Sequence, residues 1–352
     1  MEVAPGNRRD TRIRISRREL TGALGDSVTV LPVVVAVAAL TDLSLARLLL
    51  GFAAFQVVWG LYYGLPLVIA GGLGAEGLVV AGLVAGAVLV ALGTTDTLAR
   101  VEAFVGRPVV RGVQLAVGLV LLETSVQLSL DGPVYALAAL AVVGASVAAG
   151  RRRVSALLVL ALGVGVALAT TGVPTPRIPA LEVTLPTAAG VTASAAGATA
   201  AQLAMTVGNA AVATSLLLSD YYDADISADD LATSMGVMNL LALPFGAMPM
   251  CHGSGGVAGK YAFGARTAGS NLLLGALFGV AAVVGVGVVA AFPLAMLGVI
   301  LAVVAVELCR TGLDTENLPL AVGVGLLGLV TNIGVAFVVG VAVHRILPVR
   351  GS

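Results

Sequence analysis

Residues 248–266 carry the side chains and backbone pattern that could bind an anion. Pro249 is followed within ten residues by His252, Ser254 and four glycines. A proline and glycines in this order cannot continue an ordinary helix, so the pattern predicts an unwound segment that leads into a short helix. The N–H groups at such a helix start form an anion site that needs no side-chain charge. The expected substrate site comprises His252, Gly253, Ser254, Gly255 and Gly256. Close helix packing through small residues is the alternative reading.

Metal and thiol chemistry have little support in the sequence. Cys251 and His252 are adjacent, so their side chains point apart, and no second histidine or carboxylate lies nearby at ligand spacing. We therefore expect His252 to hydrogen-bond within the site, and we expect no metal and no cofactor. The second cysteine, Cys309, leaves no disulfide framework to build.

A weak internal repeat points to a second half-site. A shift of 183 residues places Asp26 on Asn209 and Pro66 on Pro249 without a gap. One gap then places Gly71 and Gly72 on two of the glycines after Pro249. Identities are few, so the interpretation depends on the aligned rare polar residues and prolines. It predicts that Gly71 and Gly72 form a second, weaker part of the anion site.

The elements that must position these residues are membrane spans. The 352 residues are 59% apolar and 11% charged, with a mean hydropathy of +1.05, whereas soluble domains are about 45–50% apolar and about 25% charged. No segment is long enough for a soluble domain, which excludes nucleic-acid binding and soluble catalysis. We expect an all-α polytopic membrane protein with spans near 24–40, 47–64, 67–75, 77–92, 109–129, 134–149, 154–170, 205–219, 231–247, 250–259, 269–290, 292–308, 317–329 and 331–347.

These fourteen spans divide into two seven-span repeats. Seven is odd, so the second copy must be inverted, which is the plan of secondary transporters that bind substrate near the midplane. Several spans are shorter than the ~20 residues of a full crossing, so we expect them to be tilted, broken or re-entrant. The expected divisions are a basic tail at 1–18, the first repeat at 19–172, an external linker at 173–201 and the second repeat at 202–352.

Basic residues predict the orientation, because cytoplasmic loops hold most of the Lys and Arg. With both termini in the cytoplasm, only Arg47 and Arg177 of the 19 basic residues fall outside, and Lys260 falls on the cytoplasmic side. We expect a multi-pass protein of the plasma membrane that contacts lipids and no nucleic acid. A homodimer is left open.

The chain resembles the molybdate transporter family, whose members are related to the sulfate permeases and lack their C-terminal cytoplasmic regulatory domain. The matching segments are 19–26 with Thr29 and Pro32, 63–66, 202–210, 219–220, 236–240 and 246–267. The resemblance implies a sulfate-permease-like fold in which two half-helices start near Pro66 and Pro249 and meet at the centre. It also implies that Asp26 and Asn209 lie beside them, and we expect Asp26, Thr29 and Asn209 to belong to the substrate site as well.

The sequence departs from that family at several positions. Residues 67–76 replace a proline-rich stretch, and Ala204, Lys260 and Ala262 stand where the family tends to have proline, glutamine and a basic residue. The resemblance therefore implies oxyanion transport without selecting the anion. We expect a molybdate carrier that works by alternating access, with sulfate or another inorganic anion as the alternative. An intramembrane enzyme using His252, Cys251 or Asp26 lacks a workable catalytic constellation. A channel would gain nothing from an inverted repeat.

Uptake of a dianion needs coupling to a cation. Entry against an inside-negative potential of about 100 mV costs roughly 4.6 kcal/mol, so we expect symport with H⁺ or Na⁺. Asp26 is the expected proton-linked group, because it lies in the first span and its repeat mate Asn209 cannot titrate. It could instead cap a broken helix. Glu76 and Glu123 are reserve candidates, although Glu76 could be a structural charge and Glu123 could mark a solvated helix end.

Overall fold

The chain folds almost entirely into helices, which confirms the all-α expectation. The computed structural model describes residues 13–40, 43–67, 70–71, 78–98, 105–151, 154–172, 175–180, 183, 203 and 206–346. The first half contains α1 (Arg17–Leu40), α2 (Leu45–Tyr63), β1 (Ala70–Gly71), α3 (Leu78–Gly93), α5 (Arg107–Asp131), α6 (Pro133–Ala148) and α7 (Ser155–Thr171). The second half contains the π-helix η3 (Thr206–Ala213), α9 (Thr214–Tyr222), α10 (Ala228–Ala242), the 3₁₀-helix η4 (Leu243–Phe245), β2 (Met250–Cys251), α11 (Ser254–Ala262), α12 (Gly269–Val284), α13 (Val286–Ala290), α14 (Leu294–Leu313), α15 (Leu318–Val330) and α16 (Ile333–Ile346).

Helices of one half pack mainly against helices of the other half. α2 lies against α12, α3 lies against α10, and α5 lies along α14. In the sequence, α2 and α3 lie on either side of β1, and α10 and α12 lie on either side of β2. When the two halves are exchanged, the α2–α12 contact therefore becomes the α10–α3 contact, and the α5–α14 contact remains the same. This exchange shows that the two halves are related by a pseudo-two-fold axis, as in the inverted repeats of secondary transporters. The expected plan of two inverted repeats is therefore confirmed.

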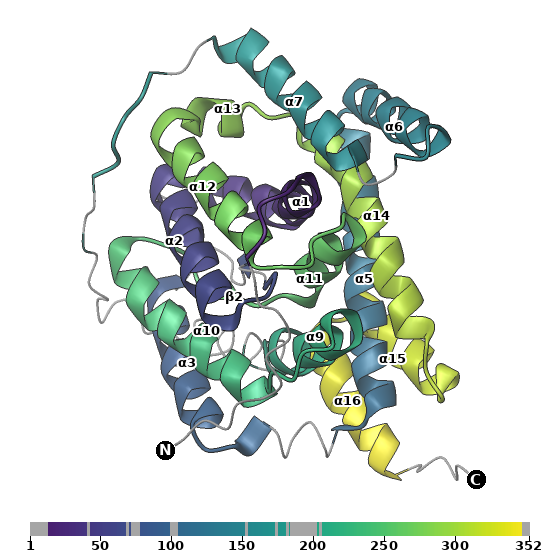
Figure 1. Cartoon of the computed structure of the whole chain (residues 1–352). Helices are drawn as coiled ribbons and strands as arrows, with labels where there is room; N and C mark the ends of the chain where they lie inside the picture. Colours follow the sequence, from purple (N-terminus) through teal and green to yellow (C-terminus); the bar gives the residue numbers. More distant parts are fainter. Residues whose placement is uncertain are drawn as a thin grey trace.

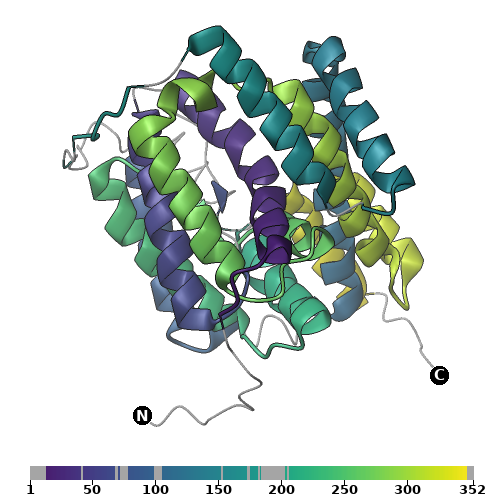
Figure 2. The ribbon, with the colours of Figure 1, turned by 45° about the horizontal axis from the view of Figure 1, so that its top comes forward.

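The helices form two groups with a third set between them. Figures 1 and 2 show α2, α3, α10 and α12 together, which we call the α2–α12 group. On the other side, α5, α6, α14, α15 and α16 form the α5–α14 group. Between the groups lie α1, α9 and α11 (Figure 1), and α1 contacts α11, α12 and α14. The residues of the expected anion site belong to this central set.

Local sequence explains where several helices begin and end. Ser227 caps α10: its hydroxyl accepts from the N–H of Asp230, and the Asp230 carboxylate accepts from the N–H of Ser227. This reciprocal capping box satisfies two N–H groups that the helix start leaves without a partner. α2 ends at Gly64, whose φ of 67° is in the left-handed region that glycine adopts without strain.

The described helices suit a bilayer by composition. Among them, α2, α5 and α14 are long and apolar enough to cross a membrane, and six shorter apolar helices accompany them. Aliphatic side chains on the outer helices face outward: Leu130, Val134 and Val330 are 71%, 75% and 76% exposed. Contact with lipid chains is favourable for such side chains, whereas contact with water is not.

Small residues let the spans approach closely. α3 and α10 meet at Gly86 and Gly236, where a Cβ atom on Gly236 would lie 2.6 Å from the carbonyl oxygen of Gly86. Helices gain little from hydrophobic burial in lipid, so such close backbone contact supplies much of their association.

Candidate functional site

The two extended segments of the halves meet at the centre of the molecule. β1 and β2 pair antiparallel, with Ala70 opposite Cys251 and Gly71 opposite Met250. The N–H of Met250 also donates to Oδ1 of Asn239 on α10, at 2.7 Å. The sequence-predicted glycine Gly71 is therefore joined to the segment that follows Pro249.

α11 begins shortly after β2, and the backbone N–H groups of its first turn are not hydrogen-bonded within the helix. The cap residue Gly253 is extended (φ −67°, ψ 132°), and the first N–H to reach back to it is that of Val257, at 3.4 Å. The three preceding N–H groups, of Ser254, Gly255 and Gly256, have no acceptor within the helix by its geometry. They carry the positive end of the helix dipole.

A π-helix lies across from this helix start. The Ser254 hydroxyl donates to Oδ1 of Asn209 in η3 at 2.5 Å, and the Thr214 hydroxyl donates to the carbonyl oxygen of His252 at 2.6 Å. These two bonds tie β2 and α11 to η3 and α9. The sequence did not predict the π-helix, a conformation that often occurs at functional sites.

His252 is fixed behind the helix start and is fully buried. Its Nε2 lies 2.8 Å from the hydroxyl oxygen of Ser234. That hydroxyl also lies within hydrogen-bonding distance of the carbonyl oxygen of Leu231, at 3.0 Å. The ring also lies edge-on to Trp59 and Tyr63, with centroids 6.4 and 6.3 Å away. These contacts hold the His252 ring in place behind the loop.

A buried ion pair joins α11 to α1. Nζ of Lys260 lies 3.2 Å from Oδ2 of Asp26, and both side chains are fully buried. The two helices can come this close because they touch at the preceding glycines: a Cβ on Gly259 would lie 3.1 Å from the carbonyl oxygen of Gly25. The sequence had placed Lys260 among the cytoplasmic basic residues, which is wrong. The lysine is held inside by a carboxylate 234 positions away in the chain.

Three further oxygens surround the same ammonium group. Nζ of Lys260 donates to the carbonyl oxygen of Leu67 at 2.6 Å, to Oδ1 of Asn271 at 2.7 Å and to Oε1 of Gln56 at 3.1 Å. Gln56 and Asn271 are also fully buried. Sequence reasoning had not selected either residue as part of a site. The available signal was a neutral amide within an otherwise apolar span.

The remaining candidate residues lie in different places. Glu123 is exposed on α5 and accepts from Nε2 of Gln127 at 3.3 Å, apart from the buried pair. Thr29 lies in α1, but its side chain is outside the described part of the structure. Gly72 and Glu76 lie outside the described residues altogether.

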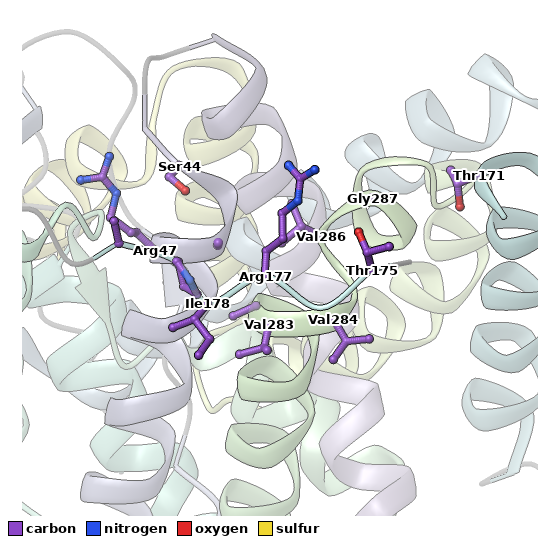
Figure 3. Close-up of a pocket in the computed structure, with 14 residues that line it drawn as sticks. Ser44, Arg47, Thr171, Thr175, Arg177, Ile178, Val283, Val284, Val286 and Gly287 are labelled. Atoms are coloured by element: carbon purple, nitrogen blue, oxygen red, sulfur yellow. The ribbon is translucent and has the colours of Figure 1, made fainter. Parts of the chain in front are cut away.

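A cavity of about 670 Å³ opens beyond the end of α1. Figure 3 shows its lining, which comes from the start of α2, the end of α7, residues 175–180 and the α12–α13 junction. Arg47 and Arg177 both line it, and their guanidinium groups extend toward the same side in Figure 3. They are the two arginines that the sequence placed outside.

A second basic pocket, of about 510 Å³, lies at the other end of α1. Arg151 and Arg266 line it beside Glu307, and the Arg266 guanidinium lies 3.8 Å from the ring centroid of Tyr261. The Glu19 carboxylate, near the start of α1, accepts from the N–H of Arg266 at 2.9 Å. The 24 residues of α1 span about 36 Å, so the two pockets lie on opposite sides of a bilayer-sized core.

Solved structures of anion transporters share this fold. The transmembrane domain of a cyanobacterial bicarbonate transporter, BicA, aligns with a TM-score of 0.55 at 18% identity and covers 93% of this chain and 96% of that one. Murine Slc26a9, an anion transporter, aligns with a TM-score of 0.62 at 12% identity and covers 96% of this chain and 69% of that one. The chain is therefore a multi-pass membrane protein with the sulfate-permease-like fold that the sequence predicted.

Sequence comparison identifies the family. Molybdate transporters 2 and 1 of Arabidopsis thaliana are each 28% identical to this chain, over 85% of it and over 79% and 80% of their own lengths. Molybdate transporter 1 of Chlamydomonas reinhardtii is 38% identical over 31% of this chain and 23% of its own length. The family described as "Molybdate transporter of MFS superfamily" matches residues 18–121 and 194–308. Because these segments make up more than half of the chain and include β1, β2 and α11, the chain belongs to this molybdate transporter family.

Proposed function

We propose that this chain is a secondary active transporter of a tetrahedral oxyanion, that its substrate is molybdate, and that it works by alternating access. The observation that carries the proposal is the start of α11, where the N–H groups of Ser254, Gly255 and Gly256 gather between the two helix groups. The plant relatives named as molybdate transporters and the anion transporters that share the fold support it.

A helix start suits an oxyanion because it supplies several N–H donors and half a positive charge without a mobile cation. In the proposed site the donors come from Gly253 to Gly256, with Asn209 positioning the Ser254 hydroxyl and His252 supporting the loop from behind. Gly71 brings the first half's strand to the same place and contributes more weakly. Sulfate has the same shape and charge, so it is the alternative substrate.

The position of α11 supports alternating access. α11 packs against α5 and α14 of the α5–α14 group and against α1. A Cβ atom on Gly255 would lie 3.1 Å from Leu121 on α5 and 3.8 Å from Leu308 on α14. Apolar side chains of the α5–α14 group thus cover this side of the helix start. Displacement of that group relative to α11 would open the site, as in carriers that rock one bundle against the other.

The two basic pockets are the proposed approaches to the site. Arginines at a cavity mouth raise the local concentration of anions. We assign the pocket with Arg47 and Arg177 to the outside and the pocket with Arg151 and Arg266 to the cytoplasm. This assignment keeps the orientation, with cytoplasmic termini, that the distribution of basic residues predicts.

Proton coupling through Asp26 is the proposed energy source. Asp26 on α1 pairs with Lys260 on α11, the helix that carries the anion site, so a proton on Asp26 would leave one net positive charge there. That charge favours a bound dianion, and the bound dianion favours the proton by the same free energy. Glu123 and Glu76 remain the reserve candidates.

The test is uptake of radiolabelled molybdate by proteoliposomes with an imposed proton gradient. Accumulation above the external concentration requires a carrier, whereas a channel only equilibrates the label and an enzyme changes its chemical form. Competition by tungstate, sulfate, selenate and chloride ranks the anions. No accumulation under either a proton or a sodium gradient would overturn the proposal. If sulfate blocks accumulation at a lower concentration than unlabelled molybdate does, sulfate and not molybdate is the substrate.

A further inference from the structure

The ammonium group of Lys260 sits in a cage of oxygens drawn from four separate elements. Asp26 comes from α1, Gln56 from α2, Asn271 from α12, and the carbonyl of Leu67 from the segment before β1. Their four oxygens lie 2.6–3.2 Å from Nζ. An ammonium has three protons for these four acceptors, so at least one N–H is shared between two acceptors.

The cage is built to point its oxygens inward. Nε2 of Gln56 donates to Oδ2 of Asp26 at 3.3 Å, which turns Oε1 of Gln56 toward the lysine. Nδ2 of Asn271 donates to the carbonyl oxygen of Leu67 at 2.6 Å, which does the same for Oδ1 of Asn271. Each amide nitrogen is thus used by another member of the cage. Such mutual bonding is how outer contacts fix the first ligands of a metal site.

The donor set matches a monovalent metal cation. One carboxylate, two side-chain amides and one backbone carbonyl are the oxygen ligands that hard cations take. A single negative charge in a fully buried site balances one positive charge, whereas a divalent ion would leave a net charge without water to screen it.

We propose that this cage is a binding site for an alkali cation and that the chain occupies it with its own ammonium group. The protein then needs no sodium or potassium at this place, and removal of the lysine side chain opens the site to a free ion. The proposal rests on the cage alone and does not depend on which anion the protein carries. The competing account is an ordinary buried ion pair, for which loss of the lysine leaves damage that no cation repairs.

The experiment uses the full-length protein in lipid nanodiscs and measures thermal unfolding in choline, sodium, potassium and rubidium chloride at equal ionic strength. Wild type should unfold at the same temperature in all four salts. Lys260→Ala should unfold earlier in choline and recover in at least one alkali salt, increasingly as the concentration of that cation rises. Above its Kd, each tenfold rise in cation concentration should favour the folded state by about a further tenfold.

Two control variants separate the cage from general salt effects. Lys260→Met keeps an unbranched side chain that fills the space, and Asp26→Asn combined with Lys260→Ala removes the charge of the cage. Neither should show a cation-specific recovery. The proposal is overturned if Lys260→Ala responds to cations no more than these controls, or if it can be purified folded in no alkali salt. A sodium or potassium response of wild type that disappears in Asp26→Asn would also overturn it.

Discussion

Replacing Asp26 by asparagine tests whether the buried pair communicates with the anion site. The substitution keeps the shape of the side chain and leaves Lys260 with one uncompensated positive charge. Lys260 follows Ser254 by six residues, which corresponds to about 9 Å along a helix. At an effective dielectric constant of about 20, a unit charge at that distance changes the energy of a monoanion by about 1.8 kcal/mol and that of a dianion by about 3.7 kcal/mol.

These energies predict a gain in affinity that depends on the charge of the ligand. Since 1.4 kcal/mol is about tenfold in a binding constant, Asp26→Asn should bind molybdate or sulfate several hundredfold more tightly and nitrate about twentyfold more tightly. Lys260→Met should weaken the binding of dianions and of nitrate by similar factors, because it leaves the uncompensated negative charge of Asp26. The double variant Asp26→Asn with Lys260→Met has a neutral pair and should return to wild-type affinity.

Equilibrium binding to purified protein, followed by calorimetry or by scintillation with labelled anion, measures each constant without transport. Loss of one partner of a buried pair costs about 3–5 kcal/mol of stability, so size-exclusion chromatography must first show that each variant is folded. Equal factors for dianions and monoanions, or a double variant that fails to restore affinity, would refute the electrostatic link.

Four other results are expected. Wild-type uptake should rise as pH falls, because protonation of Asp26 favours the dianion, and Asp26→Asn should lose that dependence; uptake that ignores pH but follows sodium would contradict proton coupling. Gly255→Val places γ-carbons against Leu121, which lies 3.1 Å from the Cβ position. It should weaken anion binding by about 5- to 150-fold through about 1–3 kcal/mol of overpacking, whereas Gly144→Val, which meets nothing within 4 Å, should not. The double variant Arg47→Gln with Arg177→Gln should raise the KM for the anion and leave kcat unchanged, and the difference in KM from wild type should shrink at high salt. An unchanged KM would exclude that pocket as an approach to the site. In a cysteine-free background, single cysteines at Arg151 and Thr175 should react with an impermeant thiol reagent from opposite sides, and equal reaction would contradict the assigned orientation.

The long spans were predictable because hydropathy alone defines them. The apolar run at 109–129 becomes α5 (Arg107–Asp131), and the run at 292–308 becomes α14 (Leu294–Leu313). The short central elements were located through Pro249 and its glycines, which break the helix and let α11 restart at Ser254. In both cases the determinant lies within a few residues of the element that it shapes.

The buried cage could not be predicted in the same way, because its members are brought together only by the fold. Lys260 lies 204 residues from Gln56 and 234 from Asp26, and nothing near it in the sequence distinguishes it from a loop lysine at a span end. Its position two turns into a nine-residue helix reads as the end of a crossing. The inverted helix pairing that turns this residue inward is a property of both halves together. The π-helix at Asn209 could not be predicted for the same reason. Asn209 accepts from Ser254, and Thr214 at the start of α9 donates to His252, so both bonds join separate elements.

The family description names the major facilitator superfamily, yet the helix pairing follows a different plan. The two halves of a major facilitator are parallel repeats related by an axis along the membrane normal. Here the halves pair crosswise, α2 with α12 and α3 with α10, and each half brings an extended segment to one central sheet. The antiparallel pairing of β1 and β2 fits an inverted repeat, in which the axis lies in the membrane plane and the two strands share one depth. The helix start that follows β2 then lies at that depth beside the α5–α14 group. A carrier of this plan would therefore expose one fixed anion site to either side by moving one helix group against the other.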